Sequence, residues 1–447
     1  MTASATPHVV DRRPLRLGIA GLRTDRATLA WCGAGLFVLC LFARSPDLFR
    51  HPRFWAEEGN LYFQAMRDLP LLQALGFVVN GNYQFLTDLF VEFAILAPPH
   101  QAAVPTTYLP LLLAGYAALL MARLLVSRGC SVAAVLAACA LFALQTAGYE
   151  VFLSATNVQW VCSVVALLLA LQDDVHATSG VAWRRYALLG ACGLTGTPSC
   201  ILLPLFLVLA WLRPNRYRLA LAGVLAAAAA IQLGILLAHA GQVHRAFEVT
   251  PKTLVSFAMQ TFLSATLPVD GLQLIGGALR DHGPHWVGMA AQVGLFGFAG
   301  LAIVALLALD RLGNTLAVIL VATAVETGLV NAFGQLGRAD DLLSSWGGAR
   351  YFFASSTCLI LMLACGLSAD AKRMRVVAGL LVAVILGNGA LSRFDADWSG
   401  LFLTGPSVSA GVEQCRGAPV CRVPVAPHGF GLTVDMRLAR TAAPALH

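Results

Sequence analysis

The chain has 447 residues, of which 58% are hydrophobic and only 12% are charged. A soluble domain carries about 25% charged residues, so this composition excludes an ordinary soluble protein. The net charge of +7 is modest, and no basic run is interleaved with aromatic residues, so we expect cytoplasmic loops facing anionic lipid and no nucleic-acid partner.

The N-terminal region predicts a cytoplasmic end followed by a membrane anchor. Residues 1–26 are polar and carry five arginines. They lack the short apolar core and the small-residue cleavage site of a signal peptide. The first apolar stretch, 27–46, is therefore expected to be a retained first span.

The rest of the chain predicts an all-α polytopic membrane protein with about eleven spans. A spanning helix needs about 20 apolar residues, and positively charged loops stay in the cytoplasm. The stretch 186–212 lies between two basic loops and is broken at Gly196-Thr197-Pro198, so we expect two shorter helices there. The predicted spans are 27–46, 104–126, 131–147, 157–171, the two halves of 186–212, 217–238, 287–309, 313–331, 351–369 and 375–390.

These spans divide the chain into a cytoplasmic N-terminus (1–26), a transmembrane domain (27–390) and a small periplasmic tail (391–447). The first outer loop is long, 47–103, and contains the apolar stretch 84–98 with Asp88 and Glu92. This stretch is short, and counting it as a span would place the following arginines outside. We therefore expect an amphipathic helix that lies in the outer membrane interface.

Two cysteines in the tail differ from the other nine. Cys415 and Cys421 lie in a polar segment, EQCRGAPVCRVP, whereas the others lie in or beside apolar segments, where a thiol behaves as a small hydrophobe. The pair predicts a disulfide in an oxidising compartment. A free or metal-binding pair is the alternative, although two cysteines alone make a poor zinc site.

The first outer loop carries two adjacent acids, Glu57 and Glu58, between Trp55 and Tyr62. Adjacent residues on a helix do not face each other, so one carboxylate can face a cavity while the other faces water. A helix is expected from 60 to 67, and an acid at its N-terminus would stabilise it. Helix capping is therefore the alternative to a catalytic role.

Further polar residues are expected at the same side of the membrane. Glu150 lies in the second outer loop with Asn157 and Trp160, and Arg350 and Tyr351 open the span 351–369 in the segment WGGARYFF. An arginine at the outer end of a helix suits an anion such as a lipid phosphate. An ordinary polar loop for Glu150 and snorkelling of Arg350 to lipid headgroups are the alternatives.

Other polar residues give a weaker indication of a functional site. Glu326 lies within the span 313–331, so it is either a functional carboxylate or a protonated packing contact. His282 and His285 lack a third metal ligand nearby. No Gly-rich phosphate loop, nucleotide fingerprint or Ser-His-Asp signature is present, so an enzyme of this kind would need a substrate that diffuses in the membrane.

The arrangement of the first 220 residues resembles the GT-C superfamily of polytopic glycosyltransferases. The shared features are a single helix, then a long outer loop with Trp55-Ala56-Glu57-Glu58-Gly59 followed by Tyr62 and Phe63. This segment looks like the acid-Gly-aromatic segment of oligosaccharyltransferase catalytic subunits and the Asp-Glu segment of protein mannosyltransferases. The stretch PTTYLPLLLAGYAALLMARLL resembles the Pro-led second helix of that group, which also places interface helices in the first outer loop.

The resemblance implies transfer of a sugar from a polyprenyl-phosphate carrier to a glycan, lipid or protein acceptor in the periplasm of a bacterium, at the inner membrane. Glu58 or Glu57 would be the general base, and Arg350 would stabilise the leaving phosphate. Further donor-binding residues would be Tyr351, Glu150 and Asn157, and the aromatic residues that would stack on sugars, or else mark the interface, are Trp55, Tyr62, Tyr83 and Trp160.

The same resemblance leaves the need for a divalent cation, Mg²⁺ or Mn²⁺, open. Glu150 is the nearest match to the family's second acidic loop, which often holds a metal or the donor. However, this chain has Glu where the family usually has Asp, and Glu150 is not part of an Asp-x-Asp arrangement.

Two other function classes remain open from the sequence. A transporter or flippase for a lipid-linked sugar would need paired repeats and several deep charges, whereas only Glu326 lies deep within a predicted span. A non-catalytic subunit of an envelope-assembly complex would tolerate loss of the outer acids.

Overall fold

The structure is a computed structural model that describes residues 25–172, 179–242, 251–267, 269–280, 286–334, 342–343, 348–391, 407–415, 420–425 and 430–435. The first half contains α1 (Arg26–Arg44), α2 (Pro46–Arg50), η1 (Glu58–Phe63), α3 (Gln64–Met66), α4 (Leu71–Ala74), β1 (Val78–Val79), β2 (Asn82–Tyr83), α5 (Phe85–Leu96), η2 (Pro99–Gln101), α6 (Ala103–Ser127), α7 (Val132–Leu144), η3 (Thr146–Gly148), α8 (Val158–Leu171), α9 (Ser179–Gly193), α10 (Thr197–Cys200) and α11 (Leu203–Leu212). The second half contains α12 (Arg216–Ala238), η4 (Ala240–Gln242), α13 (Pro251–Ala258), η5 (Met259–Leu263), α14 (Ser264–Thr266), α15 (Val269–Arg280), α16 (Trp286–Phe333), η7 (Ala349–Phe352), α17 (Phe353–Gly366), α18 (Lys372–Leu391), α20 (Val408–Gln414), β3 (Val420–Val425) and β4 (Phe430–Asp435).

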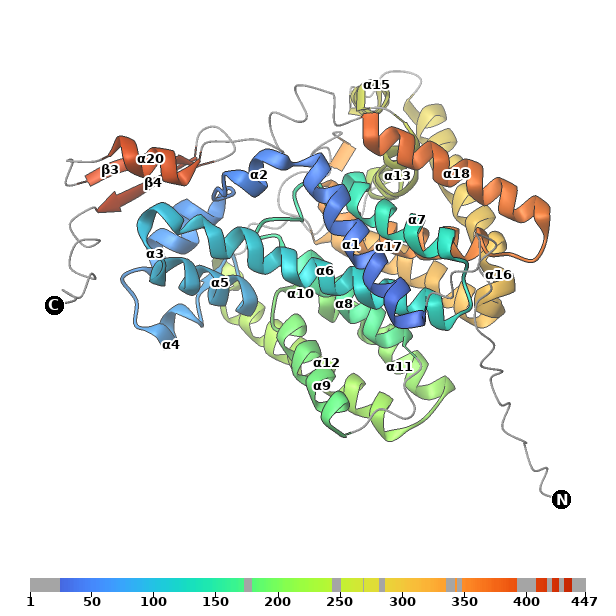
Figure 1. The fold of residues 1–447 in the computed structure, drawn as a ribbon, viewed down its shortest axis with the longest axis horizontal. Coiled ribbons are helices and arrows are strands. Elements are labelled where there is room, and N and C mark those ends of the chain that lie inside the picture. The colour runs from blue at the N-terminus through green and yellow to red at the C-terminus, as the bar shows by residue number, and fades with distance from the viewer. Residues whose placement is uncertain are drawn as a thin grey trace.

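Six helical stretches in the described part of the chain are long and apolar enough to cross a membrane. They are Arg26–Arg44, Pro99–Ser127, Arg216–Ala238, Val287–Phe333, Ala349–Gly366 and Lys372–Leu391, and shorter apolar helices span Val132–Leu144, Val158–Leu171 and Thr197–Leu212. The protein is thus a multi-pass, all-α membrane protein, as the composition predicts. Figure 1 shows these helices packed into one bundle.

Helix ends follow local sequence signals. The Asp25 carboxylate accepts from the Thr28 N–H at 2.6 Å and caps α1, and the Ser131 side chain caps α7 in the same way; such caps satisfy backbone N–H groups that have no partner inside the helix. Gly196 has a φ of +79°, a conformation that glycine adopts without strain. The predicted break between two helices in 186–212 is therefore confirmed.

The long helix α16 is two antiparallel segments joined at Gly313, whose φ is +71°. A Cβ added at Gly297 would meet Ala258, and one added at Gly328 would meet the neighbouring Phe257. In a straight helix those two glycines would lie about 46 Å apart at 1.5 Å per residue. The chain therefore reverses direction at Gly313, as the separate sequence predictions for the two segments require.

The connections gather at two ends of the bundle. We call residues 123–131, 179–185, 213–218, 310–313 and 367–375 the arginine end. Its loops are joined by Arg128 to the carbonyl of Leu171, Arg185 to the hydroxyl of Tyr217, and Arg311 to the carbonyl of Ser368. We call residues 44–102, 145–157, 194–202 and 348–352 the loop end. First outer loop denotes residues 47–103 and second outer loop denotes residues 148–157, whichever side of a membrane they face.

The loop end is also joined by hydrogen bonds between separate connections. The Gly196 N–H donates to the carbonyl of Tyr83 at 2.8 Å, and the Thr87 hydroxyl donates to the carbonyl of Ala155 at 2.8 Å. The first outer loop therefore contacts both the second outer loop and the turn before α10.

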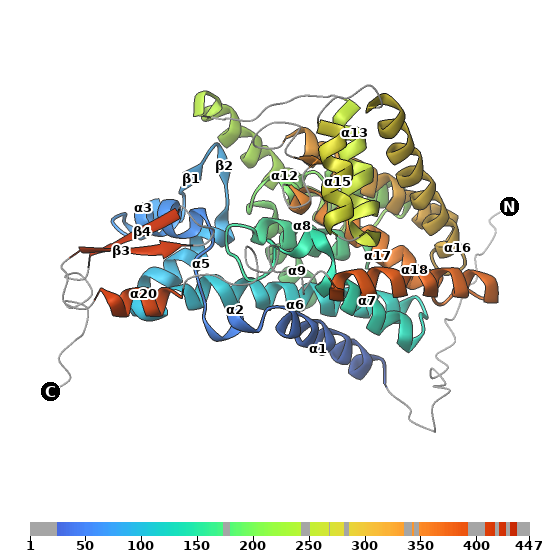
Figure 2. The same ribbon diagram turned by 90° about the horizontal axis from the view of Figure 1, so that it is seen from above.

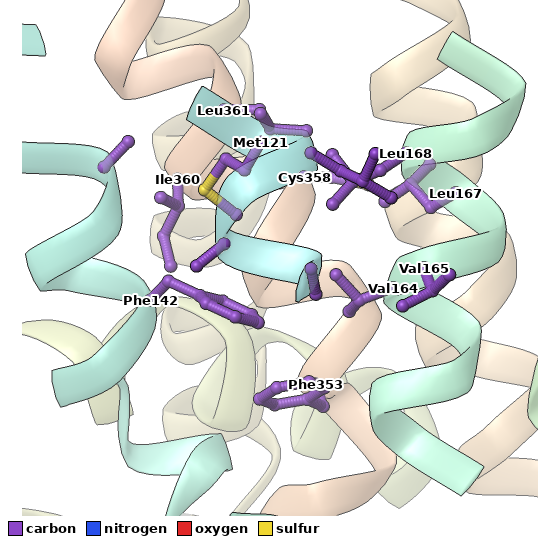
Figure 3. Packing of buried hydrophobic residues seen from close by; sticks show 14 of the residues in the cluster. Met121, Phe142, Val164, Val165, Leu167, Leu168, Phe353, Cys358, Ile360 and Leu361 are labelled. Atoms are coloured by element: carbon purple, nitrogen blue, oxygen red, sulfur yellow. The ribbon is translucent and has the colours of Figure 1, made fainter. Parts of the chain in front are cut away.

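The bundle core lies directly beneath the loop end. Figure 3 shows Phe142 and Phe353 facing each other among side chains of α6, α7, α8 and α17, and their rings are 5.6 Å apart. Phe152 from the second outer loop packs on both rings at 5.5 Å. Burial of such large aromatic side chains is a main source of stability, so the position of the second outer loop is fixed by the core.

The first outer loop and the tail share a second apolar core. Residues of η1, α3 and α5 pack with Val412, Val423, Val425 and Leu432 of the tail. Figures 1 and 2 both show α20, β3 and β4 beside the α3 region. Cys415 is disulfide-bonded. The side chain of its predicted partner, Cys421, lies outside the described residues, so the pairing stays a prediction. The sequence predicted no helices or strands in the tail, and none for the stretch that forms α13 to α15.

Candidate functional site

Glu58 is a fully buried carboxylate that joins the first two outer loops. Its Oε2 accepts from the Trp55 N–H at 2.9 Å. Its Oε1 accepts from the Ser154 hydroxyl at 2.9 Å and the Thr156 N–H at 3.2 Å, and also from the Ala155 N–H. Four donors thus converge on one side chain, the pattern expected of an anchored carboxylate.

Burial competes with these bonds in setting the charge of Glu58. Burial raises the pKa of Glu58 to about 7, while the hydrogen bonds from the Trp55 backbone and the second outer loop act to lower the pKa. Arg53 lies nearby: burial lowers its pKa to about 10, and the Glu58 charge acts in the opposite direction. Removal of a charge from water disfavours the charged form, and an opposite charge favours it.

The backbone around this carboxylate is strained. Ala56 has a φ of +45° and Leu153 has a φ of +62°, so a non-glycine residue in the left-handed region precedes the site on each loop. Such conformations cost about 1–3 kcal/mol and gather at functional sites. Glu58 also opens the π-helix η1, a rare form that is frequent at such sites.

Glu57 is exposed, unlike its neighbour, and interacts electrostatically with Arg350 and Tyr62. Arg350 also forms an ion pair with Glu150; the two side chains are 31% and 12% exposed. The first outer loop, the second outer loop and η7 therefore bring two acids to one arginine, although these residues lie far apart in the sequence.

The other predicted donor-binding residues surround this ion pair. The ring of Tyr351 lies 5.6 Å from the Arg350 guanidinium carbon and 5.2 Å from the ring of Trp160. The Trp160 Nε1–H is buried and has no hydrogen-bond partner among the described residues. The Asn157 amide donates to the carbonyl of Glu150 at 2.8 Å, so Asn157 fixes the loop that carries this acid.

The remaining predicted stacking residues are largely committed to packing. Trp55 is buried, with the Arg53 guanidinium carbon 4.6 Å from the centre of its ring. Tyr62 packs edge-on against Phe77 at 5.8 Å. The Tyr83 hydroxyl donates to the carbonyl of Leu75 at 2.9 Å.

Two charged residues at the loop end were not selected from the sequence. Arg44 is buried at the end of α1, with its guanidinium carbon 3.5 Å from the centre of the Tyr149 ring, a cation–π contact beside Glu150. Asp88 is fully buried in α5, and neither carboxylate oxygen has a hydrogen-bond partner among the described residues. Burial raises the pKa of Asp88 to about 9; the backbone N–H of Phe77 acts to lower it, and the charge of Glu92 acts to raise it.

The described residues do not form a fitting metal site. No group of three His, Cys, Asp or Glu side chains in this part of the chain is placed to hold a metal ion. Glu150, the nearest match to a metal-binding acid, is paired with Arg350, whose charge opposes a cation there. Glu326 is half-buried within α16. His282 and His285 lie outside the described residues.

No family model, curated protein or solved structure matches this chain. The resemblance to the GT-C superfamily therefore rests on the topology and on the short motifs in the first outer loop.

Proposed function

We propose that the chain crosses the bacterial inner membrane eleven times, with the arginine end in the cytoplasm and the loop end in the periplasm. The proposed crossings are α1, α6, α7, α8, α9, the pair α10–α11, α12, the two segments of α16, α17 and α18. The clustering of basic residues at one end supports this orientation, because positively charged loops stay in the cytoplasm.

We propose further that the protein is a GT-C-type glycosyltransferase whose donor is a polyprenyl-phosphate sugar and whose acceptor is a periplasmic glycan, lipid or protein. One observation carries the proposal: hydrogen bonds from Ser154 and Thr156 to Glu58 join the turn of the exposed acid Glu57 to the loop of Glu150, the ion-pair partner of Arg350. A base for the acceptor and a cation for the leaving phosphate are the two groups this transfer needs.

In the proposed reaction the acceptor hydroxyl attacks the anomeric carbon and loses its proton to Glu57. The bond between that carbon and the phosphate oxygen breaks, and the electron pair stays on the phosphate. Arg350 stabilises this developing charge, because a guanidinium binds phosphate oxygens in a bidentate manner. The phosphate then competes with Glu150 for the guanidinium, so donor binding loosens an ion pair that is already partly exposed.

The two adjacent glutamates take different roles in this proposal. Both oxygens of Glu58 accept hydrogen bonds within the protein, and the side chain is fully buried. It therefore holds the two outer loops together as a positioning residue. Glu57 has no such bond among the described contacts and faces outward, so it is the better placed base. The buried rings of Tyr351 and Trp160 pack on each other beside Arg350 and help to position its guanidinium.

The test uses the purified protein in lipid nanodiscs with a radiolabelled undecaprenyl-phosphate monosaccharide panel and envelope extract as the acceptor source. Glu57→Gln is expected to lower turnover by about 10²–10⁴-fold, the usual contribution of a general base. The control is Asp68→Asn, an exposed acid of the same loop, which is expected to leave turnover unchanged.

Full activity of Glu57→Gln would remove the proposed base. Loss of activity in Glu58→Gln alone, with a folded protein, would assign the base to Glu58 instead. Movement of the labelled lipid between leaflets without a covalent product would favour the transporter. Absence of both, with a stably co-purifying envelope protein, would favour the scaffold subunit.

A further inference from the structure

We propose that the C-terminal segments 407–415, 420–425 and 430–435, which contain α20, β3 and β4, form a positioning module for the proposed active site, and that the disulfide at Cys415 must be intact for the module to hold the turn carrying Glu57 and Glu58. The link to activity rests on the proposed function, whereas the docking itself does not.

Val425 of the module packs on Gly59 in that turn. Val425 of β3 is 2% exposed. A Cβ added at Gly59 would lie 2.8 Å from Val425 Cγ2 and 3.4 Å from the Cβ of Phe54. Carbon atoms in contact normally lie about 3.5–4.0 Å apart. Only glycine therefore lets β3 approach η1 so closely, two residues after Glu57.

The module contacts two parts of the first outer loop, η1 and η2. At the start of the loop, β3 and β4 lie against η1, and at its end, α20 lies against η2. Within the module, Gly411 of α20 packs against Val423 of β3. The segment between η1 and η2 is thus closed into a ring by a part of the chain more than 300 residues later in sequence.

The disulfide lies inside the same apolar cluster. Cys415 is 2% exposed and packs with Val412, Val423 and Phe63. A segment of this size does not fold alone without a staple, because its core is too small to offset the loss of conformational entropy. Reduction of the disulfide is therefore expected to release the module, and with it the constraint on Glu57. Misplacement of a reacting group by about 1 Å can cost about 10²-fold in rate.

The first test is a suppressor pair read by hydrogen exchange. Gly59→Ala collides with Val425 and is expected to speed amide exchange in the peptide 54–66. Val425→Ala removes the colliding methyl groups, so the double variant Gly59→Ala with Val425→Ala is expected to restore slow exchange. Gly76→Ala is the matched control, since a Cβ there meets only ordinary contacts at 3.6 and 3.8 Å. Unchanged exchange in Gly59→Ala, or no recovery in the double variant, would overturn the docking.

The second test measures exchange and turnover together before and after treatment with dithiothreitol, with Cys415→Ser as the genetic equivalent. We expect faster exchange in 54–66 and a loss of turnover of about tenfold or more, with recovery on reoxidation of the wild type. Faster exchange with unchanged turnover in an active enzyme would overturn the positioning role. If the untreated wild type transfers no sugar, the proposed function fails, while the exchange data still decide whether the module holds the turn.

Discussion

The two ends of the bundle differ in how far their charged side chains are exposed to water. At the arginine end the ion pair between Arg311 and Asp370 is open to water, with side chains 29% and 81% exposed. At the loop end Glu58 and Asp88 are fully buried, and Arg44 and Arg53 are nearly so. Water solvates the exposed ion pair, so that pair has little desolvation cost. The buried charged groups lose this solvation and bear the full cost.

We interpret the exposed charges as setting the orientation of the protein in the membrane, and the buried charges as part of the functional site. Arginines in exposed loops act through their sum, so individual positions are replaceable. Buried ions cost several kcal/mol unless they are paired, and the loop end carries them in strained backbone beside an exposed acid. Arrangements that lower stability in this way are concentrated at functional sites. Three substitutions test whether the two ends differ as we infer.

The largest effect is expected from Glu58→Ala. This change leaves four donors, three of them backbone N–H groups, without their acceptor. The free energy of unfolding is expected to fall by about 3–5 kcal/mol. Thermal unfolding followed by intrinsic fluorescence in detergent measures the effect.

Glu57→Ala is the matched control, because the same atoms are removed one residue away from an exposed position. We expect it to change stability by less than about 1 kcal/mol. Equal melting temperatures for the two variants would show that the buried carboxylate does not hold the loops together.

The second effect has the opposite sign and concerns Asp88→Asn. Burial raises the pKa of Asp88 to about 9 from an ordinary value of 3.8. The folded protein therefore binds a proton here at pH 7 that the unfolded chain does not, and stability falls as pH rises from about 4 through 9. Asparagine is neutral at every pH, so the variant is expected to be more stable at pH 7 by on the order of 4 kcal/mol.

The gain should shrink toward zero near pH 4, where the unfolded chain also becomes protonated. Melting temperatures of wild type and variant across pH 4–9 test this. Asp68→Asn, an exposed acid of the same loop, should show no such divergence. Parallel curves for Asp88→Asn and wild type would mean that Asp88 is ionised in the folded protein.

Much of the bundle was predictable because its signals are local. The length of an apolar stretch and the basic residues that flank it are each read within one segment, and they located α1, α6 and α12 within two residues of the predicted bounds. The stretch that forms α13 to α15 was missed because its helices are short and only partly apolar. Their burial depends on α16, which follows later in the chain.

The individual residues of the site were predictable from the sequence, whereas their contacts in space were not. Adjacency implied that Glu57 and Glu58 face different ways, whereas the choice between them depends on Ser154 and the backbone of the second outer loop. Asp88 was interpreted as part of a polar helix face. The structure instead buries it and exposes Phe93 and Leu96 on the same helix, by 47% and 76%, the reverse of a helix that faces water.

The smallest effect is expected at the arginine end, from Asp370→Asn. The Arg311 guanidinium donates to the Asp370 carboxylate at 2.7 Å, but it also donates to the carbonyl of Ser368 at 2.6 Å, and that second bond survives the substitution. The exposed pair should contribute less than about 1 kcal/mol, and raising the salt concentration should erase the difference between variant and wild type. A loss as large as that of Glu58→Ala, persisting in high salt, would mean that solvent exposure does not distinguish the two ends. The buried acids of the loop end would then need no functional explanation.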